Sequence, residues 1–458
     1  MIYVWRVLVV KKKLIKQLFA LVAVFLMASS LITPNASAAS KFPNVEADAA
    51  ILIEADTGQI LYEKNSGAVL GIASMTKMMT EYLILEAIHE EKLSWDDQVG
   101  VSKYAADISQ DYSLSNVPLL TTEKYTIKEL YEAMAIYSAN GASIALAEAL
   151  AGSEAEFIKL MNKKAEELNL GEAKFVNSTG LSNSLLKGQH PKGTKADDEN
   201  LLSARAVSAL AFHILHDYPE VLETAKTPEK IFRPGQQGET TMDNWNKMLP
   251  SFPTYGYEGL DGLKTGHTDF AGYCFTGTAE RDGVRYITVV MNAKNNGKSF
   301  EGARFTETKK LLDYAFDNYE LKQVTPEGKV VKNHESLPVV KGKNKELKVV
   351  TKESVNVLTK KGEEGKISLQ FDVNPKVVDE KDRIVAPIKE GQVVGYVSAK
   401  NKNLDDLGYA VNDGTNKVPV VADTTIEKAN WFILALRSVG DFFVGVWSDA
   451  ANNIKSWF

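Results

Sequence analysis

The sequence predicts a mixed α/β domain, followed by a small all-β domain and a C-terminal amphipathic helix. Three observations predict this order. Helical and strand patterns mix over residues 39–320, short alternating runs rich in Val, Lys and Gly fill residues 321–421, and residues 422–458 repeat apolar side chains at three- and four-residue steps. The chain has 458 residues, which is more than one domain of ordinary size, so several folded units are expected.

The composition excludes several classes of protein. Hydrophobic residues make up 44% and charged residues 24%, which is unlike collagen, a disordered chain or a multi-span membrane protein. The net charge of −6 and the lack of a long basic run in the body of the chain argue against a nucleic-acid partner. The single cysteine, Cys274, excludes cysteine-based zinc sites and iron–sulfur clusters. His213 and His216 lack an acidic partner at a suitable step, so neither a metal nor a cofactor is expected.

The N-terminus has the pattern of a secretory signal peptide over residues 1–38. Four lysines between Lys11 and Lys16 precede an apolar run at 18–27, and small residues follow at 36–38, which predicts cleavage after Ala38. A retained membrane anchor is the alternative, but the run is shorter than the roughly 20 residues that a spanning helix needs. Cleavage removes five cationic residues and no acidic ones, so the net charge changes from −6 to −11. An exported chain with one cysteine suggests a bacterial surface protein that does not depend on disulfides.

Six elements are predicted within residues 39–320. In order, they are two short strands over 50–64 about an Asp-Thr-Gly turn, a helix from about Ser74, a helix from Thr126 to Ala151, a central strand at 284–292 and a closing helix at 300–317.

The all-β domain, residues 321–421, is predicted from five short strand-like runs separated by turn residues. They lie at 347–350, 355–358, 367–373, 384–388 and 393–397. None of them contains a nucleophile with a partner, so a spacer or docking role is expected.

Residues 422–458 are predicted to anchor the protein at a membrane surface. Apolar side chains from Phe432 to Trp457 share one helical face, and polar side chains occupy the other. Charges interrupt the segment too often for it to span a bilayer, but it can lie in the interface with Trp431, Trp447 and Trp457 at headgroup depth. A helix packed on the protein's own core, or a dimer helix, is the alternative.

A serine activated by a lysine is the strongest catalytic candidate. In Ser74-Met75-Thr76-Lys77, a helix starting at Ser74 would bring the ammonium one turn back over the hydroxyl. The first backbone amides of that helix would face a developing oxyanion.

The spacing alone is weak evidence, because Ser184 and Lys187 repeat it. Two further motifs strengthen the first copy. Ser138-Ala139-Asn140 lies 64 residues on, and Lys264-Thr265-Gly266 lies another 126 residues on. Ser354-Val355-Asn356 repeats the second motif in the β-rich region, whereas the Lys-Thr-Gly motif occurs once.

These ordered motifs, with their context at 51–58, 177–181 and 261–268, resemble the low-molecular-mass penicillin-binding proteins, which are serine-type D-alanyl-D-alanine carboxypeptidases of the peptidase S11 type. The resemblance covers nearly the whole chain. It implies a transpeptidase-like α/β (α+β) catalytic domain with an antiparallel sheet flanked by helices over 39–320, a β domain over 321–421 and an anchoring helix over 422–458.

The resemblance also implies roles for the motif residues. Ser74 would be the acylated nucleophile, and Lys77 the base whose pKa is depressed by burial and by Lys264. Ser138 would relay a proton to the leaving nitrogen, and Asn140 would bind the substrate peptide. Lys264 and Thr265 would bind the terminal carboxylate of the substrate. Gly266 would allow the strand to approach the substrate closely. The backbone amides of Ser74 and His267 would form the oxyanion hole.

The expected function is removal of the terminal D-alanine from peptidoglycan stem peptides, on the outer face of the cytoplasmic membrane, with β-lactams as acylating inhibitors. A serine β-lactamase is the first alternative. Class A β-lactamases use a deacylating glutamate in Glu-x-x-Leu-Asn, but here Leu168-Asn169 is preceded by Ala165 at the glutamate position. A non-catalytic cell-wall binding protein is the second alternative, and the intact motifs argue against it.

Overall fold

The computed structural model describes residues 42–434, apart from 333, 364, 382, 405–406 and 412–416. The predicted signal peptide lies outside the described residues, as does the predicted C-terminal helix beyond residue 434.

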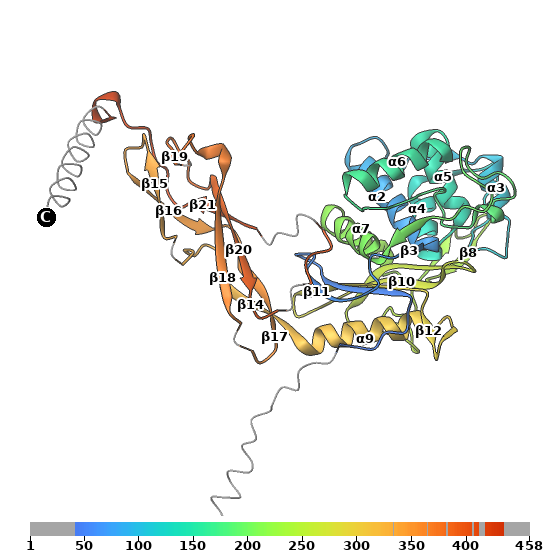
Figure 1. Cartoon of the computed structure of the whole chain (residues 1–458). Helices are drawn as coiled ribbons and strands as arrows, with labels where there is room; N and C mark the ends of the chain where they lie inside the picture. Colours follow the sequence, from blue (N-terminus) through green and yellow to red (C-terminus); the bar gives the residue numbers. More distant parts are fainter. Residues whose placement is uncertain are drawn as a thin grey trace, which may run out of the picture. The chain divides into compact units, whose positions relative to one another are not determined.

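A five-stranded antiparallel sheet forms the centre of the N-terminal region (Figure 1). Its order across the sheet is β2 (Ile60–Lys64), β1 (Ala49–Glu54), β11 (Val284–Met291), β10 (Gly272–Arg281) and β9 (Leu260–Thr268). β11 is the predicted central strand, and it pairs with β1 on one side and β10 on the other. β9 lies at one edge of the sheet.

Helices cover both faces of this sheet, which confirms the predicted fold class (Figure 1). One face carries α9 (Ala303–Asn318), and the other carries α7 (Ala204–Asp217) with the remaining helices beyond it. The side chains of β1 alternate between two cores: Ile51 and Ile53 pack with the helices on the α7 side, and Leu52 packs with α9. Because both faces are buried, β1 reads as a continuous apolar run.

The other helices of this region gather on the α7 side. They are α2 (Lys77–His89), α3 (Lys103–Ser109), α4 (Ile127–Tyr137), α5 (Asn140–Ala151), α6 (Glu154–Glu167) and α8 (Val221–Ala225), with short 3₁₀ turns η1 (Ala73–Thr76) and η2 (Asn183–Leu185). Three two-stranded ribbons lie among the segments that link these helices: β3 (Val69–Gly71) with β6 (Leu201–Ser203), β4 (Gln98–Gly100) with β5 (Lys124–Thr126), and β7 (Glu229–Phe232) with β8 (Thr240–Asp243). A fourth ribbon, β12 (Lys294–Asn295) with β13 (Lys298–Ser299), lies between β11 and α9.

The predicted helix from Thr126 to Ala151 is wrong as one helix, because it consists of α4 and α5. Thr126 and Glu129 form a capping box at the start of α4. The break occurs at Ser138, which takes a left-handed conformation with φ 59° and ends α4. A helix cannot continue through a residue in this conformation, so α5 begins anew at Asn140 and ends at Gly152, which is also left-handed.

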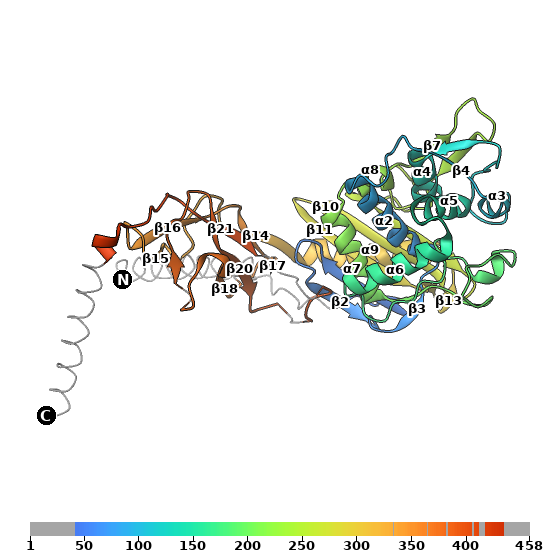
Figure 2. The same ribbon diagram turned by 90° about the horizontal axis from the view of Figure 1, so that it is seen from above.

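The C-terminal region is built from strands, as predicted (Figure 2). β14 (Tyr319–Thr325) pairs with β17 (Val355–Lys360), and a six-stranded sheet has the order β18 (Ile367–Val373), β20 (Val393–Asn401), β21 (Val418–Ala422), β16 (Glu346–Thr351), β15 (Ser336–Val340) and β19 (Ile384–Val385). A 3₁₀ turn, η3 (Pro375–Val377), follows β18. The run predicted at 384–388 is a strand only over β19, since Pro387 has no N–H to donate to a neighbouring strand.

The start of the segment predicted as an amphipathic helix packs in the core of this β-rich region. Ile426 is 2% exposed, belongs to that core and forms a β-bridge with Ile388. Ala429 is also buried, whereas Trp431 and Phe432 are 79% and 56% exposed and begin a helical turn. Within the described residues, no helix is both long enough and apolar enough to cross a bilayer.

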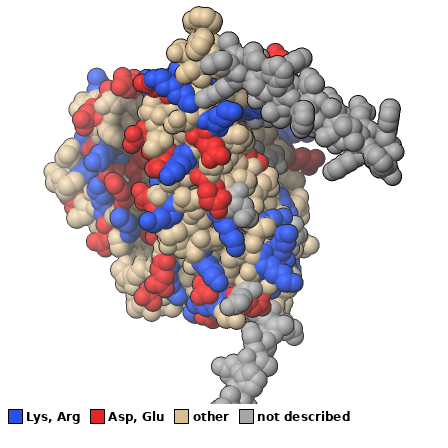
Figure 3. Space-filling view, turned by 90° about the vertical axis from the view of Figure 1, so that its left-hand side faces the viewer, with Lys and Arg blue, Asp and Glu red and all other residues tan. Residues whose placement is uncertain are grey.

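Charged side chains of both signs are interspersed over the face of the molecule drawn in Figure 3. Opposite charges this close together largely cancel each other's field at a distance. Salt screens the remainder beyond a Debye length of roughly 8 to 10 Å.

Candidate active site

A cleft with a volume of about 620 Å³ opens where the edge strand β9 meets η1. Six of the eight predicted site residues line it, namely Ser74, Ser138, Asn140, Thr265, Gly266 and His267. The other two, Lys77 and Lys264, are buried beside it. The structure therefore brings together three motifs that lie far apart in the sequence.

The nucleophile candidate lies on a tight turn. Ser74 is the second residue of η1, and Lys77 is the first residue of α2, so the predicted helix begins three residues later than expected. The preceding residue, Ala73, has φ 46°, a left-handed conformation that is costly for a residue with a side chain. This turn leaves the Ser74 side chain partly exposed to the cleft while its neighbours are buried.

Lys77 contacts Ser74 directly. Its Nζ lies 3.1 Å from Ser74 Oγ and donates to Asn140 Oδ1 at 2.9 Å. It also donates to the backbone carbonyl of Thr179 at 2.6 Å. The side-chain amide of Asn140 is oriented by its own Nδ2, which donates to the Ser115 carbonyl at 3.0 Å.

The electrostatic surroundings favour a neutral Lys77. Burial lowers the pKa of the Lys77 ammonium well below its ordinary value, and the positive charge of Lys264 lowers it further, whereas Glu81 opposes both effects. A neutral amine beside a serine hydroxyl can accept its proton, which is the property that a general base requires.

The third motif lies on β9. Lys264 and Thr265 are both buried, and burial lowers the pKa of Lys264, against the opposing charge of Glu81. A Cβ atom at Gly266 would lie 2.6 Å from the Ile72 carbonyl oxygen and 3.2 Å from the Met75 nitrogen. The backbone of Gly266 therefore lies close to η1, the turn that carries the candidate nucleophile Ser74 and is called the nucleophile turn below. A side chain at this position would push β9 away from η1.

His267 follows on the same strand, and its ring stacks on that of Tyr273 with centroids 4.1 Å apart. Burial lowers the pKa of His267, and the nearby charge of Arg304 acts in the same direction. Cys274 pairs with Gly266 across β9 and β10 and is fully buried, and burial raises the pKa of its thiol to about 11. Such a thiol packs as a small apolar side chain.

Arg304 also lines the cleft and is 3% exposed, although it belongs to none of the three motifs. Its Nη2 donates to Glu301 at 2.8 Å, while its buried Nε has no hydrogen-bond partner among the described residues. The feature of the sequence that could have indicated Arg304 is its position in the first turn of α9. A cation is disfavoured there by the helix dipole, so its presence calls for another reason.

Glu81 and Thr179 were missed as well. Glu81 is buried on α2, and burial raises the pKa of its carboxyl, against the opposing charges of Lys264 and Lys77. The feature of the sequence that could have indicated Glu81 is an acid placed four residues after the candidate base, on the same face of the helix. Thr179 contributes a backbone carbonyl, for which no side-chain signal exists.

The two repeated motifs do not form a second serine–lysine pair. Ser184 lines the rim of the same cleft, but its hydroxyl pairs with that of Ser182 at 2.9 Å, and Lys187 Nζ donates instead to the Asp107 carbonyl at 2.7 Å. Ser354 lies in the β-rich region, where its hydroxyl accepts from Gln323 at 2.9 Å.

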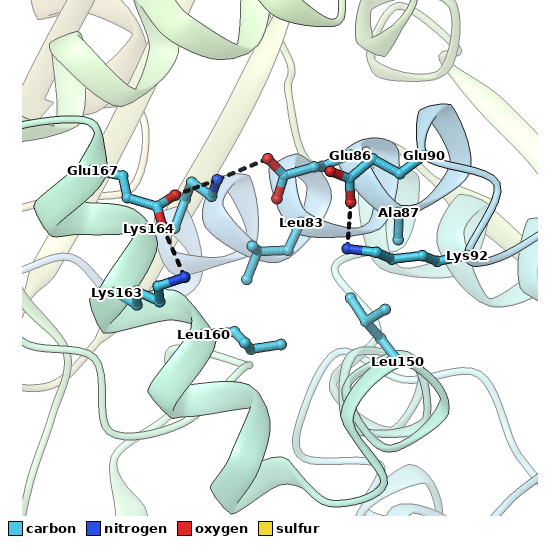
Figure 4. A pocket seen from close by; sticks show the side chains of 10 residues that line it. All are labelled: Leu83, Glu86, Ala87, Glu90, Lys92, Leu150, Leu160, Lys163, Lys164 and Glu167. Atoms are coloured by element: carbon cyan, nitrogen blue, oxygen red, sulfur yellow. Dashed lines mark hydrogen bonds and ion pairs between the residues drawn. The ribbon is translucent and has the colours of Figure 1, made fainter.

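A smaller hollow of about 300 Å³ lies elsewhere, between α2 and α6 (Figure 4). Leu83, Leu150 and Leu160 line it, and Lys164 pairs with Glu86 and Glu167 at 2.7 and 2.6 Å. It contains no nucleophile, and its charged groups neutralise one another, so the larger cleft is the candidate site.

The segment compared with the β-lactamase glutamate lies at the end of α6, beside this smaller hollow. Ala165 is buried in the helical core, and Leu168 caps α6. Neither these residues nor Asn169 are among the described residues that line the Ser74 cleft. Across the described part of the chain, no group of three or more His, Cys, Asp or Glu side chains is placed to hold a metal ion.

Together, a serine–lysine pair at the edge of a helix-flanked antiparallel sheet and buried cations beside it define a serine hydrolase of the penicillin-binding type. The sequence profile of the peptidase S11 family of D-alanyl-D-alanine carboxypeptidases matches residues 35–295, and the chain belongs to this family. The profile of the C-terminal domain of penicillin-binding protein 5 matches residues 319–428.

Individual relatives agree with this assignment. D-alanyl-D-alanine carboxypeptidase DacF of Bacillus subtilis is 35% identical over 397 residues, covering 87% of this chain and 90% of that protein. D-alanyl-D-alanine carboxypeptidase DacC of Escherichia coli is 28% identical over 434 residues, covering 93% and 94%. The crystal structure of a peptidoglycan synthesis regulatory factor (PBP3) from Streptococcus pneumoniae has a TM-score of 0.72 and 34% identity, covering 84% of this chain and 100% of that one.

Proposed function

We propose that this chain removes the terminal D-alanine from peptidoglycan stem peptides through an acyl-enzyme on Ser74. The observation that carries the proposal is the position of Lys77, whose buried Nζ lies 3.1 Å from Ser74 Oγ in a cleft lined by the other two motifs. The family supports both the substrate class and acylation by β-lactams.

In the first step, Ser74 Oγ attacks the carbonyl carbon of the D-alanyl-D-alanine bond while Lys77 accepts the hydroxyl proton. The C–N bond then breaks, and the leaving amine of D-alanine receives a proton through Ser138. The backbone amides of Ser74 and His267 stabilise the negative charge on the carbonyl oxygen. In the second step, water hydrolyses the ester, which frees Ser74 and the shortened peptide.

The terminal carboxylate of the substrate binds between β9 and the start of α9. Lys264 and Arg304 are buried cations on these two elements, and the Thr265 hydroxyl lies on the same strand as Lys264. The Arg304 guanidinium lines the cleft and is the kind of charged donor that binds a carboxylate. A substrate anion would thus offset buried positive charge that is otherwise costly.

Release of D-alanine from a peptide ending in D-Ala-D-Ala tests the proposal, with Ser74→Ala as the inactive comparison and Ser354→Ala, in the repeated motif of the β-rich region, as the control. We expect the wild type and Ser354→Ala to release D-alanine equally and Ser74→Ala to release none. A wild type as inert as Ser74→Ala would contradict the enzyme and favour a cell-wall binding protein.

A labelled penicillin separates the carboxypeptidase from the β-lactamase. We expect a long-lived adduct whose mass maps to the peptide containing Ser74. Rapid hydrolysis of the penicillin with no trapped adduct would favour the lactamase instead. The Ser74→Ala variant controls for non-specific labelling.

We further propose that the exported protein is held at the outer face of the cytoplasmic membrane by its C-terminal segment. Trp431 and Phe432 are exposed aromatic side chains at the point where the described chain leaves the β-rich region. Aromatic residues suit the membrane interface, and the amphipathic pattern continues in the sequence to Phe458.

A further inference from the structure

The loop at residues 177–181 lies behind the nucleophile turn, and its side chains are fully buried at Asn177, Ser178 and Thr179. Its nearest approach to the chemistry is the Thr179 carbonyl, which accepts from Lys77 Nζ at 2.6 Å. A Cβ atom at Gly180 would lie 1.9 Å from the Ala73 carbonyl oxygen, so the loop backbone lies directly against the turn that carries Ser74.

The contacts of Lys77 determine where its lone pair points. A neutral amine has two N–H groups and one lone pair. The Thr179 carbonyl and Asn140 Oδ1, at 2.6 and 2.9 Å, can only accept, so each takes one N–H. The lone pair is then left facing the third neighbour, Ser74 Oγ, at 3.1 Å. A base must present its lone pair to the proton that it removes.

The Asn177 side chain holds the Thr179 carbonyl in this position. Its Oδ1 accepts from the backbone N–H groups of Thr179 and Gly180 at 3.0 and 2.7 Å and from the Thr179 hydroxyl at 2.9 Å. Its Nδ2 donates to the Leu181 carbonyl at 2.8 Å. The Thr179 hydroxyl closes the turn by accepting from the Leu181 N–H at 3.0 Å.

Asn200 joins the loop to the nucleophile turn. Its Nδ2 donates to Thr76 Oγ1 at 2.8 Å and to the Asn177 carbonyl at 2.9 Å, and its Oδ1 accepts from the Val176 N–H at 2.6 Å. Thr76 is the last residue of η1 and immediately precedes Lys77, the first residue of α2. The loop and the base are therefore parts of one buried hydrogen-bonded unit.

We propose that Asn177 and Thr179 are positioning residues for the general base: by fixing the Thr179 carbonyl on Lys77, they direct the lone pair of Lys77 toward Ser74. The inference rests on the proposed function, because it takes Lys77 to be the base. Neither residue needs to touch the substrate, so their loss should lower the rate of acylation without weakening substrate binding.

The test compares Asn177→Ala with a matched control, Asn162→Ala. Asn162 makes two hydrogen bonds to the backbone of Phe175, two residues before Asn177, at 2.9 and 3.0 Å. It makes a third to the Ile158 carbonyl within α6 at 2.9 Å, and none is described to residues 177–181. The acylation rate with a labelled penicillin, kcat and KM for a D-Ala-D-Ala peptide, and Tm are measured for each. We expect Asn177→Ala to lose roughly 10- to 100-fold in acylation and kcat with KM unchanged, as for a misplaced catalytic group. Asn162→Ala should lose Tm but stay within threefold of wild-type acylation.

A second pair keeps the proposal testable if Asn177→Ala does not fold. Thr179→Val has nearly the shape of threonine but lacks the hydroxyl that closes the turn, whereas Thr179→Ser retains it. We expect slow acylation in Thr179→Val and near-normal acylation in Thr179→Ser at similar Tm. Wild-type acylation in both Thr179→Val and any folded Asn177→Ala, or an equal loss in Asn162→Ala, would overturn the inference. A failure of the proposed function would look different, because the wild type itself would form no adduct.

Discussion

Glu81 lies four residues after Lys77 on α2, so both side chains leave the helix on the same face, and both are buried. Glu81 is the acid whose charge opposes the lowered pKa of both lysines of the site, Lys77 and Lys264. We therefore expect Glu81 to influence the pH range over which Lys77 is a neutral base while Lys264 remains a cation.

The Glu81→Gln variant should work over a more acidic pH range than the wild type. Glu81 raises the pKa of Lys77 and of Lys264, so its removal lowers both. Lys264 then loses its charge at lower pH, so the alkaline limb of the acylation profile should move toward acid. The acid limb should move less, because burial raises the pKa of Glu81 to about 7 and Glu81 is itself neutral at the acid end of the range. The profile is measured as the acylation rate between pH 5 and 9.

Glu86→Gln is the control for this shift. Glu86 is also on α2, but it pairs with Lys164 in the smaller hollow, away from Ser74. Its profile should match the wild type. A Glu81→Gln profile that is unmoved, or that moves toward alkaline pH, would rule out this role for Glu81.

Arg304→Gln should weaken recognition of the substrate's terminal carboxylate. Losing one hydrogen bond to a charged group costs about 2 kcal/mol, or roughly 30-fold in kcat/KM. For a peptide or penicillin-like ligand whose carboxylate is replaced by an amide, we expect the substitution to lower the rate less. That ligand has no negative charge for Arg304 to bind. Lys309→Gln, an exposed position on the same helix, should leave both rates unchanged. Equal losses on the acid and the amide would place Arg304 in a structural role.

Gly266→Ala should separate β9 from the nucleophile turn. The added Cβ atom would lie 2.6 Å from the Ile72 carbonyl oxygen, which is backbone and cannot rotate away. We expect acylation to fall at least 10-fold, because misplacing a catalytic group by about 1 Å can cost 100-fold. Gly100→Ala is the control, since its Cβ atom would meet nothing within 4 Å. Normal acylation by Gly266→Ala at wild-type Tm would contradict this, because it would show that the surrounding backbone can move enough to accommodate the added methyl group.

Residues of the site differ in how far the sequence could predict them. Ser74 and Lys77 were found because one helical turn joins them, and such a spacing is visible in the sequence. Thr179 is 102 residues from Lys77 and contributes a carbonyl that every residue type has, so only the folded chain reveals it. Arg304 reaches the cleft through the packing of α9 on β10, which is another long-range relationship.

The break between α4 and α5 was missed for a related reason. Good helix formers dominate residues 127–137 and 142–151, which favours one continuous helix, although Ser138, Asn140 and Gly141 between them are poor helix formers. The left-handed Ser138 is instead held by its surroundings, which include the Ser115 carbonyl bound by both the backbone N–H and the side chain of Asn140. The fold class was easier to predict, because β1 and β11 show their burial directly as apolar runs.

Removing residues 431–458 should release an active enzyme from the membrane. The cut follows Asn430 because Ile426 and Ala429 are buried in the β-rich region, and a deletion from residue 424 would remove them and lower its Tm. Binding of the exported form to vesicles of neutral or anionic lipid is measured by flotation, alongside penicillin acylation. We expect the full chain to float with both lipids and with little dependence on salt, since a net charge near −11 gives no attraction to anionic lipid. The shortened protein should stay in solution and acylate at the wild-type rate. Vesicle binding that persists after the deletion would mean that another surface of the protein contacts the membrane.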